Sequence, residues 1–432
     1  MNRGIWPKLI ALAAVTLFLA AFVILTGGGR KGIRIEGGKL TLDGKTVYLR
    51  GVMYFQPHAF HQFFWEEMDS EKMREDLSRI AEEGFNAIAV QVNWGSFTSR
   101  VNETARSFEA NSTTENRLED LLCEARRRGL IVILWFGVSR VPQGVDAKLY
   151  PASTDAGGRH HGSFYGYLLH NYPGIAYFQN YTWRRFLEFH ERVARITSRF
   201  GNVIYDPLDW QHLNINPWTW GDPLNLKAWR RYLMETNPDL DFWNRRWGEH
   251  NRGWDEVLLP VDVWVRNTAA RLPNSPYAAI PESPYTSAKW RDFARWQDEL
   301  YLQVARQIIE AVRRGNPRAV IGQRVDLWRY GQYRNRTWGP PGVDLYFAGD
   351  YPQNREEADD ASRVVDRTLG ILRSHGAREL PAIFWETGID VRSIYPSLTE
   401  EAREEKRAYY IVGLDEECRR RGLLGWCWWV WR

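Results

Sequence analysis

The chain has few cysteines for its 432 residues: Cys123, Cys418 and Cys427. They form no CxxC pair and have no histidine nearby at zinc-ligand spacing, so the sequence signals neither a disulfide framework nor a zinc site. We therefore expect structural thiols in the core, no metal ion and no cofactor.

The chain also has no large excess of positive or negative charge. It contains 57 Lys and Arg residues and 53 Asp and Glu residues, for a formal net charge of +4. The basic residues form no stripe, which argues against nucleic-acid binding. With 44% hydrophobic and 25% charged residues, the chain is long enough to bury a large core, in one big α/β domain or two ordinary ones.

Only one long hydrophobic run is present, from Leu9 to Thr26, behind Arg3 and Lys8. Its eighteen residues are enough to span a bilayer as a helix. A cleaved signal peptide is the competing interpretation, but the run exceeds a usual h-region and is followed by a poor cleavage site. We expect residues 1–32 to form a membrane anchor with a Gly-rich link, and residues 33–432 to fold.

The side of the membrane follows less directly from the sequence, because basic residues flank the hydrophobic run on both sides. Four Asn-x-Ser/Thr sequons favour an exported domain; they begin at Asn102, Asn111, Asn180 and Asn335. We expect the folded part outside the cell, tethered by the anchor or secreted if the segment is cleaved.

One pattern repeats along the folded part: an amphipathic helix ends near a glycine and an apolar strand follows. After a short hairpin that turns at residues 42–45, eight such strands can be counted: Val47–Tyr54, Phe85–Val92, Leu130–Phe136, a run from Asn202, a run from Asn316, Val343–Ala348, Leu380–Trp385 and a run from Leu423. All-apolar strands expect cover on both faces, so the sequence predicts an α/β fold, a (β/α)8 TIM barrel. A doubly wound open sheet is the alternative, but the first βα turn has no Gly-rich phosphate loop.

The helix signals support this reading. Met73, Leu77, Ile80 and Ala81 share one helical face, with Asp69 or Ser70 available as the N-cap. Glycine takes the left-handed position after a helix at little cost, and we expect this role at Gly84, Gly129, Gly201, Gly315, Gly376 and Gly422.

A single carboxylate stands where the seventh strand ends. The apolar run from Pro381 to Trp385 leads directly into Glu386. Retaining glycoside hydrolysis needs two carboxyl groups roughly 5 Å apart, contributed by different strand ends of a barrel. The fourth strand runs from Val203 toward Asn214 and Asn216 and offers no glutamate there.

Aromatic residues are abundant, with 22 Trp and 20 Tyr. Flat rings pack against the apolar faces of sugars, although many of these side chains would simply fill a large core. Residues 214–290 are rich in Trp, Pro and Asn, and we expect this long insertion to build the rim of a site.

Several motifs, in order, resemble the catalytic domain of glycoside hydrolase family 42, the β-galactosidase-like barrels of the retaining clan A. They are Pro142, His170-Asn-Tyr-Pro, Tyr181-Thr-Trp-Arg-Arg-Phe, Asp209-Trp-Gln-His-Leu-Asn, Ala228-Trp-Arg-Arg-Tyr-Leu, Phe242-Trp-Asn-Arg-Arg-Trp-Gly, Trp254-Asp-Glu-Val-Leu-Leu-Pro, Lys289-Trp-Arg-Asp-Phe, Gly349-Asp-Tyr-Pro, Trp385-Glu386 and Trp428-Trp-Val-Trp-Arg432. The likeness covers most of residues 47–432 and implies a TIM barrel that acts on carbohydrate.

The resemblance also implies roles for individual residues. Glu386 would be the nucleophile and Tyr351 would hydrogen-bond it. Asn214 would hold the sugar 2-hydroxyl, and Trp431 would stack beneath the ring. Further candidates for sugar contact are Trp94, Trp218 and Trp428.

The chain departs from the family at the general acid. Where the family has Asn-Glu, this chain has Asn214-Ile215, and the neighbouring Asn216 cannot donate a proton as a carboxylic acid does. Loss of general-acid help costs about 10²- to 10⁴-fold. Asp222 or Glu282, in the long insertion, would have to replace it.

Two functions therefore stay open at the sequence level. The first is a membrane-anchored retaining β-glycosidase with a replacement acid. The second is a carbohydrate-binding or scaffold protein on the same barrel, without turnover. The cysteines that hold zinc in family members are missing from residues 217–229, and the sequence leaves the sugar, the linkage and the oligomeric state undetermined.

Overall fold

The structure is a computed structural model that describes most of the folded part of the chain. The described residues are 32–59, 63–102, 104–137, 142–143, 153–154, 160–161, 180–208, 223–260, 287–325, 342–374 and 380–429. No helix within these ranges is long and apolar enough to cross a membrane. The predicted anchor at residues 9–26 lies outside them.

Eight parallel strands close into one barrel, in the order β4-β5-β8-β11-β12-β13-β14-β15, which confirms the predicted TIM-barrel topology. Their bounds are Leu49–Met53, Ala87–Asn93, Ile131–Gly137, Val203–Asp206, Val320–Val325, Leu345–Ala348, Ala382–Thr387 and Gly425–Trp428. Every residue of β5 and β8 is buried, because helices cover the outer face and side chains fill the interior.

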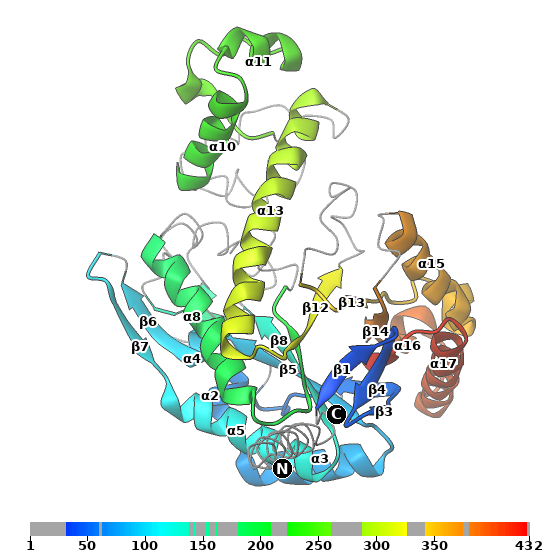
Figure 1. The fold of residues 1–432 in the computed structure, drawn as a ribbon. Coiled ribbons are helices and arrows are strands. Elements are labelled where there is room, and N and C mark those ends of the chain that lie inside the picture. Colours follow the sequence, from blue (N-terminus) through cyan, green and yellow to red (C-terminus); the bar gives the residue numbers. More distant parts are fainter. Residues whose placement is uncertain are drawn as a thin grey trace, which may run out of the picture.

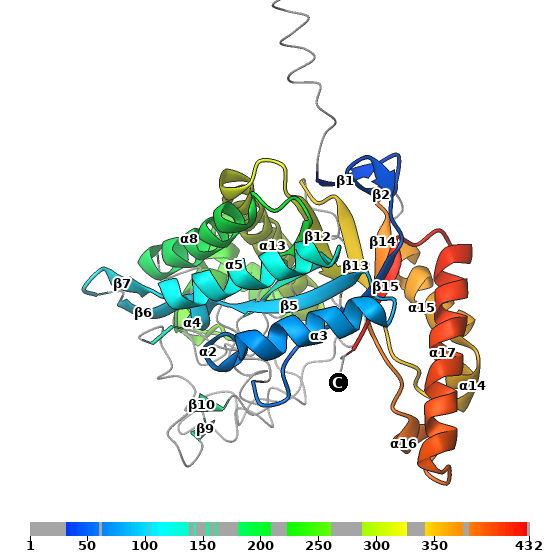
Figure 2. The same cartoon turned by 90° about the horizontal axis from the view of Figure 1, so that it is seen from below.

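Helices surround the barrel on its outside (Figures 1 and 2). The long ones are α3 (Ser70–Glu82), α5 (Ser112–Arg127), α8 (Asn180–Thr197), α13 (Ala288–Gly315), α15 (Ala361–Ser374) and α17 (Glu400–Arg420). Asp69 is the N-cap of α3 and accepts hydrogen bonds from the backbone of Glu71 and Lys72, as the sequence predicts. Met73, Leu77 and Ile80 are buried against the barrel.

Shorter elements connect these parts. They are α2 (Phe64–Glu67), α4 (Trp94–Phe97), β6 (Thr98–Asn102), β7 (Ser107–Ala110), β9 (Ser153–Thr154), β10 (His160–His161), α14 (Arg355–Asp359) and α16 (Val391–Ile394). Strands β6 and β7 pair with each other, as do β9 and β10, so neither pair belongs to the barrel sheet.

Of the glycines predicted to follow helices, four behave as predicted and one does not, while Gly376 lies outside the described residues. The φ angles of Gly84, Gly129, Gly201 and Gly422 are all positive, which is the left-handed cap conformation. The prediction is wrong for Gly315, which is the last residue of α13 itself. A Cβ atom there would lie 2.2 Å from the carbonyl oxygen of Glu191 in α8, so glycine is needed for the close approach of two helices.

A small antiparallel sheet precedes the barrel and contains the predicted hairpin. Its strands are β1 (Ile33–Glu36), β2 (Lys39–Leu42) and β3 (Lys45–Thr46). Between β2 and β3, Asp43 and Gly44 both have positive φ, as a two-residue type I′ turn requires. The backbone N–H of Ile33 donates to the carbonyl oxygen of Gly201, 2.7 Å away, which fastens β1 to the amino-terminal end of the barrel.

The described part of the long insertion is helical. It contains α10 (Pro223–Thr236), α11 (Leu240–Trp247) and the short 3-10 helix η4 (Trp254–Glu256). Together with the first half of α13 these helices form a projection that stands away from the barrel (Figure 1). Stacked tryptophans fill its interior, with the rings of Trp229 and Trp247 centred 6.2 Å apart.

Candidate functional site

Glu386 ends the seventh barrel strand with an unusual backbone conformation. Along β14, Ala382 and Phe384 pack outward in a cluster with residues of α15 and α17. Trp385 packs on the other side, where its ring lies 4.7 Å from that of Phe347. Strict alternation would then turn Glu386 outward.

A local irregularity prevents that outcome. Glu386 has a φ of 50°, and the pairing of β14 with β15 shifts register between Phe384 and Thr387. Such a shift lets two consecutive side chains share one side of a strand. The left-handed conformation costs a non-glycine residue about 1–3 kcal/mol, and strain of this kind gathers at functional sites. The carboxylate is thereby directed to the inner side, at the carboxyl end of the barrel.

Two side chains from neighbouring strands meet this carboxylate. Arg324, near the end of β12, forms an ion pair with Glu386. Tyr351, which follows β13, places its hydroxyl 3.4 Å from Oε1 of Glu386. The side chains of Arg324 and Glu386 are only 10% and 21% exposed, so water screens their interaction weakly.

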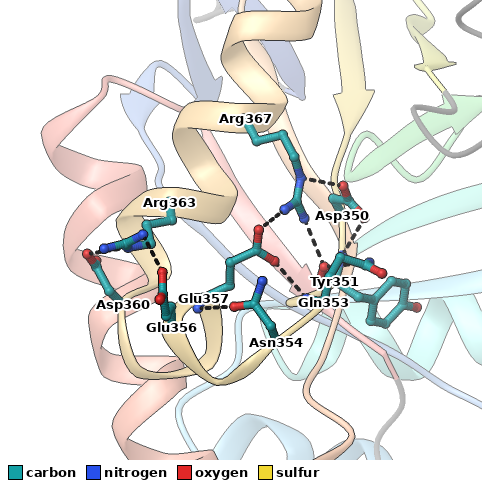
Figure 3. Close-up of polar contacts among 9 residues, drawn as sticks. All are labelled: Asp350, Tyr351, Gln353, Asn354, Glu356, Glu357, Asp360, Arg363 and Arg367. Carbon is teal, nitrogen blue, oxygen red and sulfur yellow. Dashed lines mark hydrogen bonds and ion pairs between the residues drawn. The ribbon is translucent and has the colours of Figure 1, made fainter. Parts of the chain in front are cut away.

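Tyr351 is held in place by a network centred on Arg367 of α15 (Figure 3). Nε of Arg367 donates to Asp350 at 2.9 Å, and its Nη2 donates to the carbonyl oxygen of Tyr351 at 3.0 Å. Glu357 pairs with the same guanidinium. Burial raises the pKa of the Tyr351 phenol, with the charge of Arg324 opposing that rise. The phenol therefore keeps its proton at neutral pH and can donate a hydrogen bond to Glu386.

Other residues of the inner surface were not predicted from the sequence. The guanidinium of Arg324 lies over the ring of Trp135 in β8, 5.2 Å from its centre. Asp206, which ends β11, is buried and pairs in register with Trp135. Since the Tyr205 hydroxyl bonds outward to Thr197 of α8, alternation turns Asp206 inward. A carboxylate directly after the apolar run of β11 is the signal that could have identified it.

The predicted fourth strand is shorter than expected, because β11 ends at Asp206. Six predicted site residues lie outside the described residues: Asn214, Asn216, Trp218, Asp222, Glu282 and Trp431. Their roles stay predictions. Of the predicted site residues, the structure brings together Glu386 and Tyr351.

Two predicted sugar-contact residues lie in packed surroundings. Trp94 is fully buried, with its ring 4.9 Å from that of Phe186 in α8. The ring of Trp428 is 6.3 Å from that of Tyr410 in α17, on the outside of the barrel. Their roles stay predictions that this packing does not favour. Trp429 is half-buried, and its ring lies 6.5 Å from that of Phe55. Of the two neighbouring tryptophans, Trp429 is therefore better placed than Trp428 for contact with a sugar.

Within the described ranges, no three His, Cys, Asp or Glu side chains gather as metal ligands. Cys418 and Cys427 are buried core thiols, as expected, whereas Cys123 is exposed. The expectation of a core position is therefore wrong for Cys123, which lies on the solvent side of α5.

Comparisons with known proteins bear on the fold. No family model matches the chain, and a search of curated proteins finds no match. Among solved structures, an exo-β-1,4-mannosidase from Opitutaceae bacterium strain TAV5 is similar at a TM-score of 0.51 and 14% identity, over 92% of this chain and 55% of that one. A β-galactosidase from the Antarctic haloarchaeon Halorubrum lacusprofundi gives 0.53 and 16%, over 88% and 52%.

A family 5 mannosidase from Rhizomucor miehei is similar at a TM-score of 0.51 and 12% identity, over 94% of this chain and 86% of that one. The chain thus spans about half the length of the first mannosidase and of the β-galactosidase. At these identities the likeness concerns the fold: a TIM barrel of the kind found in glycoside hydrolases.

Proposed function

We propose that this protein is a retaining β-glycosidase, tethered to the membrane and acting on extracellular carbohydrate. The observation that carries the proposal is the conformation of Glu386. A strained backbone turns this one carboxylate to the inner side of the barrel, where an arginine and a tyrosine hold both of its oxygens. In TIM-barrel enzymes, catalytic residues come from this end of the strands.

The chemistry follows from that geometry. Glu386 attacks the anomeric carbon, the bond from that carbon to the leaving oxygen breaks, and a glycosyl ester on Glu386 forms. Water then cleaves the ester and restores the carboxylate. Arg324 favours the ionised form of the nucleophile before attack, and the Tyr351 hydroxyl fixes the orientation of Oε1.

The departing oxygen needs a proton, and the family to which the sequence is similar supplies it from the glutamate replaced here by Ile215. We propose Asp222 or Glu282 for this role. Substrates with good leaving groups need little acid help, so they separate the role of Glu386 from that of the acid.

The test uses a panel of activated aryl β-glycosides with wild type and Glu386→Ala. We expect wild type to release the aryl group, Glu386→Ala to be inactive, and azide to restore turnover by entering the space left by the carboxylate. The proposal is wrong if no β-glycoside in a broad panel shows turnover that depends on Glu386.

A second function is favoured by one specific observation, the Asn214-Ile215 pair in place of Asn-Glu. A non-catalytic carbohydrate-binding protein on the same barrel would keep affinity for sugar without turnover. Binding of oligosaccharides, measured by calorimetry, together with no release from any activated glycoside would favour this alternative.

A further inference from the structure

A hollow lies at the end of the barrel opposite Glu386. It has a volume of about 360 Å³ and is lined by β1, by the ends of α8 and α13, and by the first residues of β11 and β12. We call it the basal cleft, defined by Gly32, Arg34, Ser198, Arg313, Arg318 and Asp344. Because strands begin at this end, it is the amino-terminal end of the barrel.

Three arginines line the basal cleft beside two carboxylates, those of Glu36 and Asp344. Arg313 is already used, since it donates to Asp344 at 2.9 Å, and that carboxylate also accepts from the backbone of Ile321 at 2.8 Å. Arg34 is half-buried and Arg318 is exposed. Among the residues that the structure describes, neither of these two arginines forms an ion pair.

The predicted anchor would bring this end of the barrel near the membrane. Thr26 ends the hydrophobic run and Gly32 lies in the basal cleft, six residues later. Six extended residues span at most about 20 Å. A bilayer entered at Thr26 therefore lies within that distance of Gly32, which lines the same cleft as Arg34 and Arg318. Arg30 and Lys31 add two cations to the connecting segment.

We propose that the barrel stands on the bilayer by its amino-terminal end, with the basal cleft binding the phosphate of an anionic phospholipid headgroup. Glu386 then faces away from the membrane, toward soluble or wall-bound glycan. Basic residues next to a membrane span attract anionic lipid in this way, and guanidinium groups bind phosphate oxygens in pairs. The proposal rests on the predicted anchor and is independent of the glycosidase activity.

Orientation is tested on the full chain in nanodiscs, in a Cys123→Ser background that removes the exposed thiol. A fluorophore is placed at Glu36→Cys, in the lining of the basal cleft, or at Gln353→Cys, near Glu386. Headgroup nitroxide lipids should quench the label at position 36 several-fold more than the label at position 353. Equal quenching, stronger quenching at 353, or none at either position would overturn the proposal.

Headgroup binding is tested by native mass spectrometry of the full chain in nanodiscs of phosphatidylcholine and phosphatidylglycerol. The measurement counts the phosphatidylglycerol molecules that stay bound when the protein is released from the nanodisc. Arg34→Gln with Arg318→Gln should lose most of the bound phosphatidylglycerol. Arg231→Gln with Arg392→Gln, on exposed helices elsewhere, should lose none. Equal retention by both pairs of variants would overturn the proposal. Competition by millimolar inorganic phosphate, without any preference for phosphatidylglycerol, would also overturn it, because free phosphate would then be the ligand.

Discussion

The two ends of the barrel satisfy their polar groups in different ways. Near the amino-terminal end, the Tyr205 hydroxyl lies between Thr197 and Asn316, at 2.7 and 3.0 Å. At the carboxyl end, Tyr351 makes a longer contact of 3.4 Å to Glu386, whose backbone is strained. Short, complete hydrogen bonds at one end stabilise the fold, whereas strain and a concentrated charge pair at the other end are typical of a reaction site.

The largest effect is expected from Glu386→Gln, which keeps the size of the side chain and an oxygen acceptor for Arg324. Turnover of an activated aryl glycoside should fall by about 10⁴-fold or more, because the amide cannot form the glycosyl ester. Initial rates measure this loss, and circular dichroism checks that the fold is intact. Full activity in a folded Glu386→Gln variant would contradict the view that the carboxyl end of the barrel is a reaction site.

Arg324→Met should reduce kcat/KM by about 10²- to 10³-fold, since a preorganised charged donor next to the nucleophile is lost. The acid limb of the pH profile should move to higher pH, because an arginine beside a carboxylate favours its ionised form. Arg324→Lys keeps the charge and should leave the limb near its wild-type position. An unmoved limb in both variants would make Arg324 a structural residue only.

A matched pair of tyrosine variants compares the two ends directly. Tyr351→Phe should lower kcat by roughly 10-fold with little change in stability, as expected for one hydrogen bond to a charged group. Tyr205→Phe should cost about 1–3 kcal/mol of unfolding free energy, because Thr197 and Asn316 lose a buried partner, while kcat stays unchanged. Denaturant unfolding and steady-state kinetics on both variants measure the contrast. A loss of stability in Tyr351→Phe together with a loss of kcat in Tyr205→Phe would contradict it.

The smallest effect on activity is expected from a change on the outside of the barrel, at Asp415 of α17. Burial alone would raise the pKa of this carboxyl, but hydrogen bonds from Arg50, Trp426 and Arg419 hold it well below its usual range. A depressed pKa in the folded state contributes stability that is present above the unfolded pKa and lost as pH falls through the folded value.

Asp415→Asn should therefore destabilise the protein by about 2 kcal/mol at pH 7. The difference from wild type should shrink progressively below about pH 4, near the ordinary pKa of an aspartate. Thermal unfolding across this pH range measures it, and kcat near neutral pH should not change. A difference that stays constant with pH would mean that the charge of Asp415 contributes nothing to stability.

The barrel could be predicted from the sequence because its signals are local. Apolar runs mark the strands, and glycines such as Gly84 and Gly129 end the helices before them. Local patterns also identify Glu386 as a strand-end carboxylate. They do not reveal which way its side chain turns, because that depends on its φ angle and on a register shift against β15.

Tyr351 is predicted as a partner of Glu386 by the family resemblance, but Arg324 is harder to predict. Arg324 interrupts the apolar pattern of β12, and only the strand order of the closed barrel brings it to a carboxylate on β14. Gly315 was misassigned because close contact between α8 and α13 leaves no local sequence signal. Trp428 is predicted to contact sugar, although alternation along β15 turns Trp429, and not Trp428, to the same side as the buried Cys427.

The most direct test of the role of Glu386 is covalent trapping with a fluorosugar inactivator that carries a dinitrophenyl leaving group. Fluorine next to the anomeric carbon slows hydrolysis of the glycosyl ester, so the intermediate accumulates and can be located by peptide mass spectrometry. We expect one sugar attached to the peptide that contains Glu386, with loss of activity in proportion to labelling. Labelling of another carboxylate, or none after inactivators of several sugar types, would contradict the assignment of Glu386 as nucleophile.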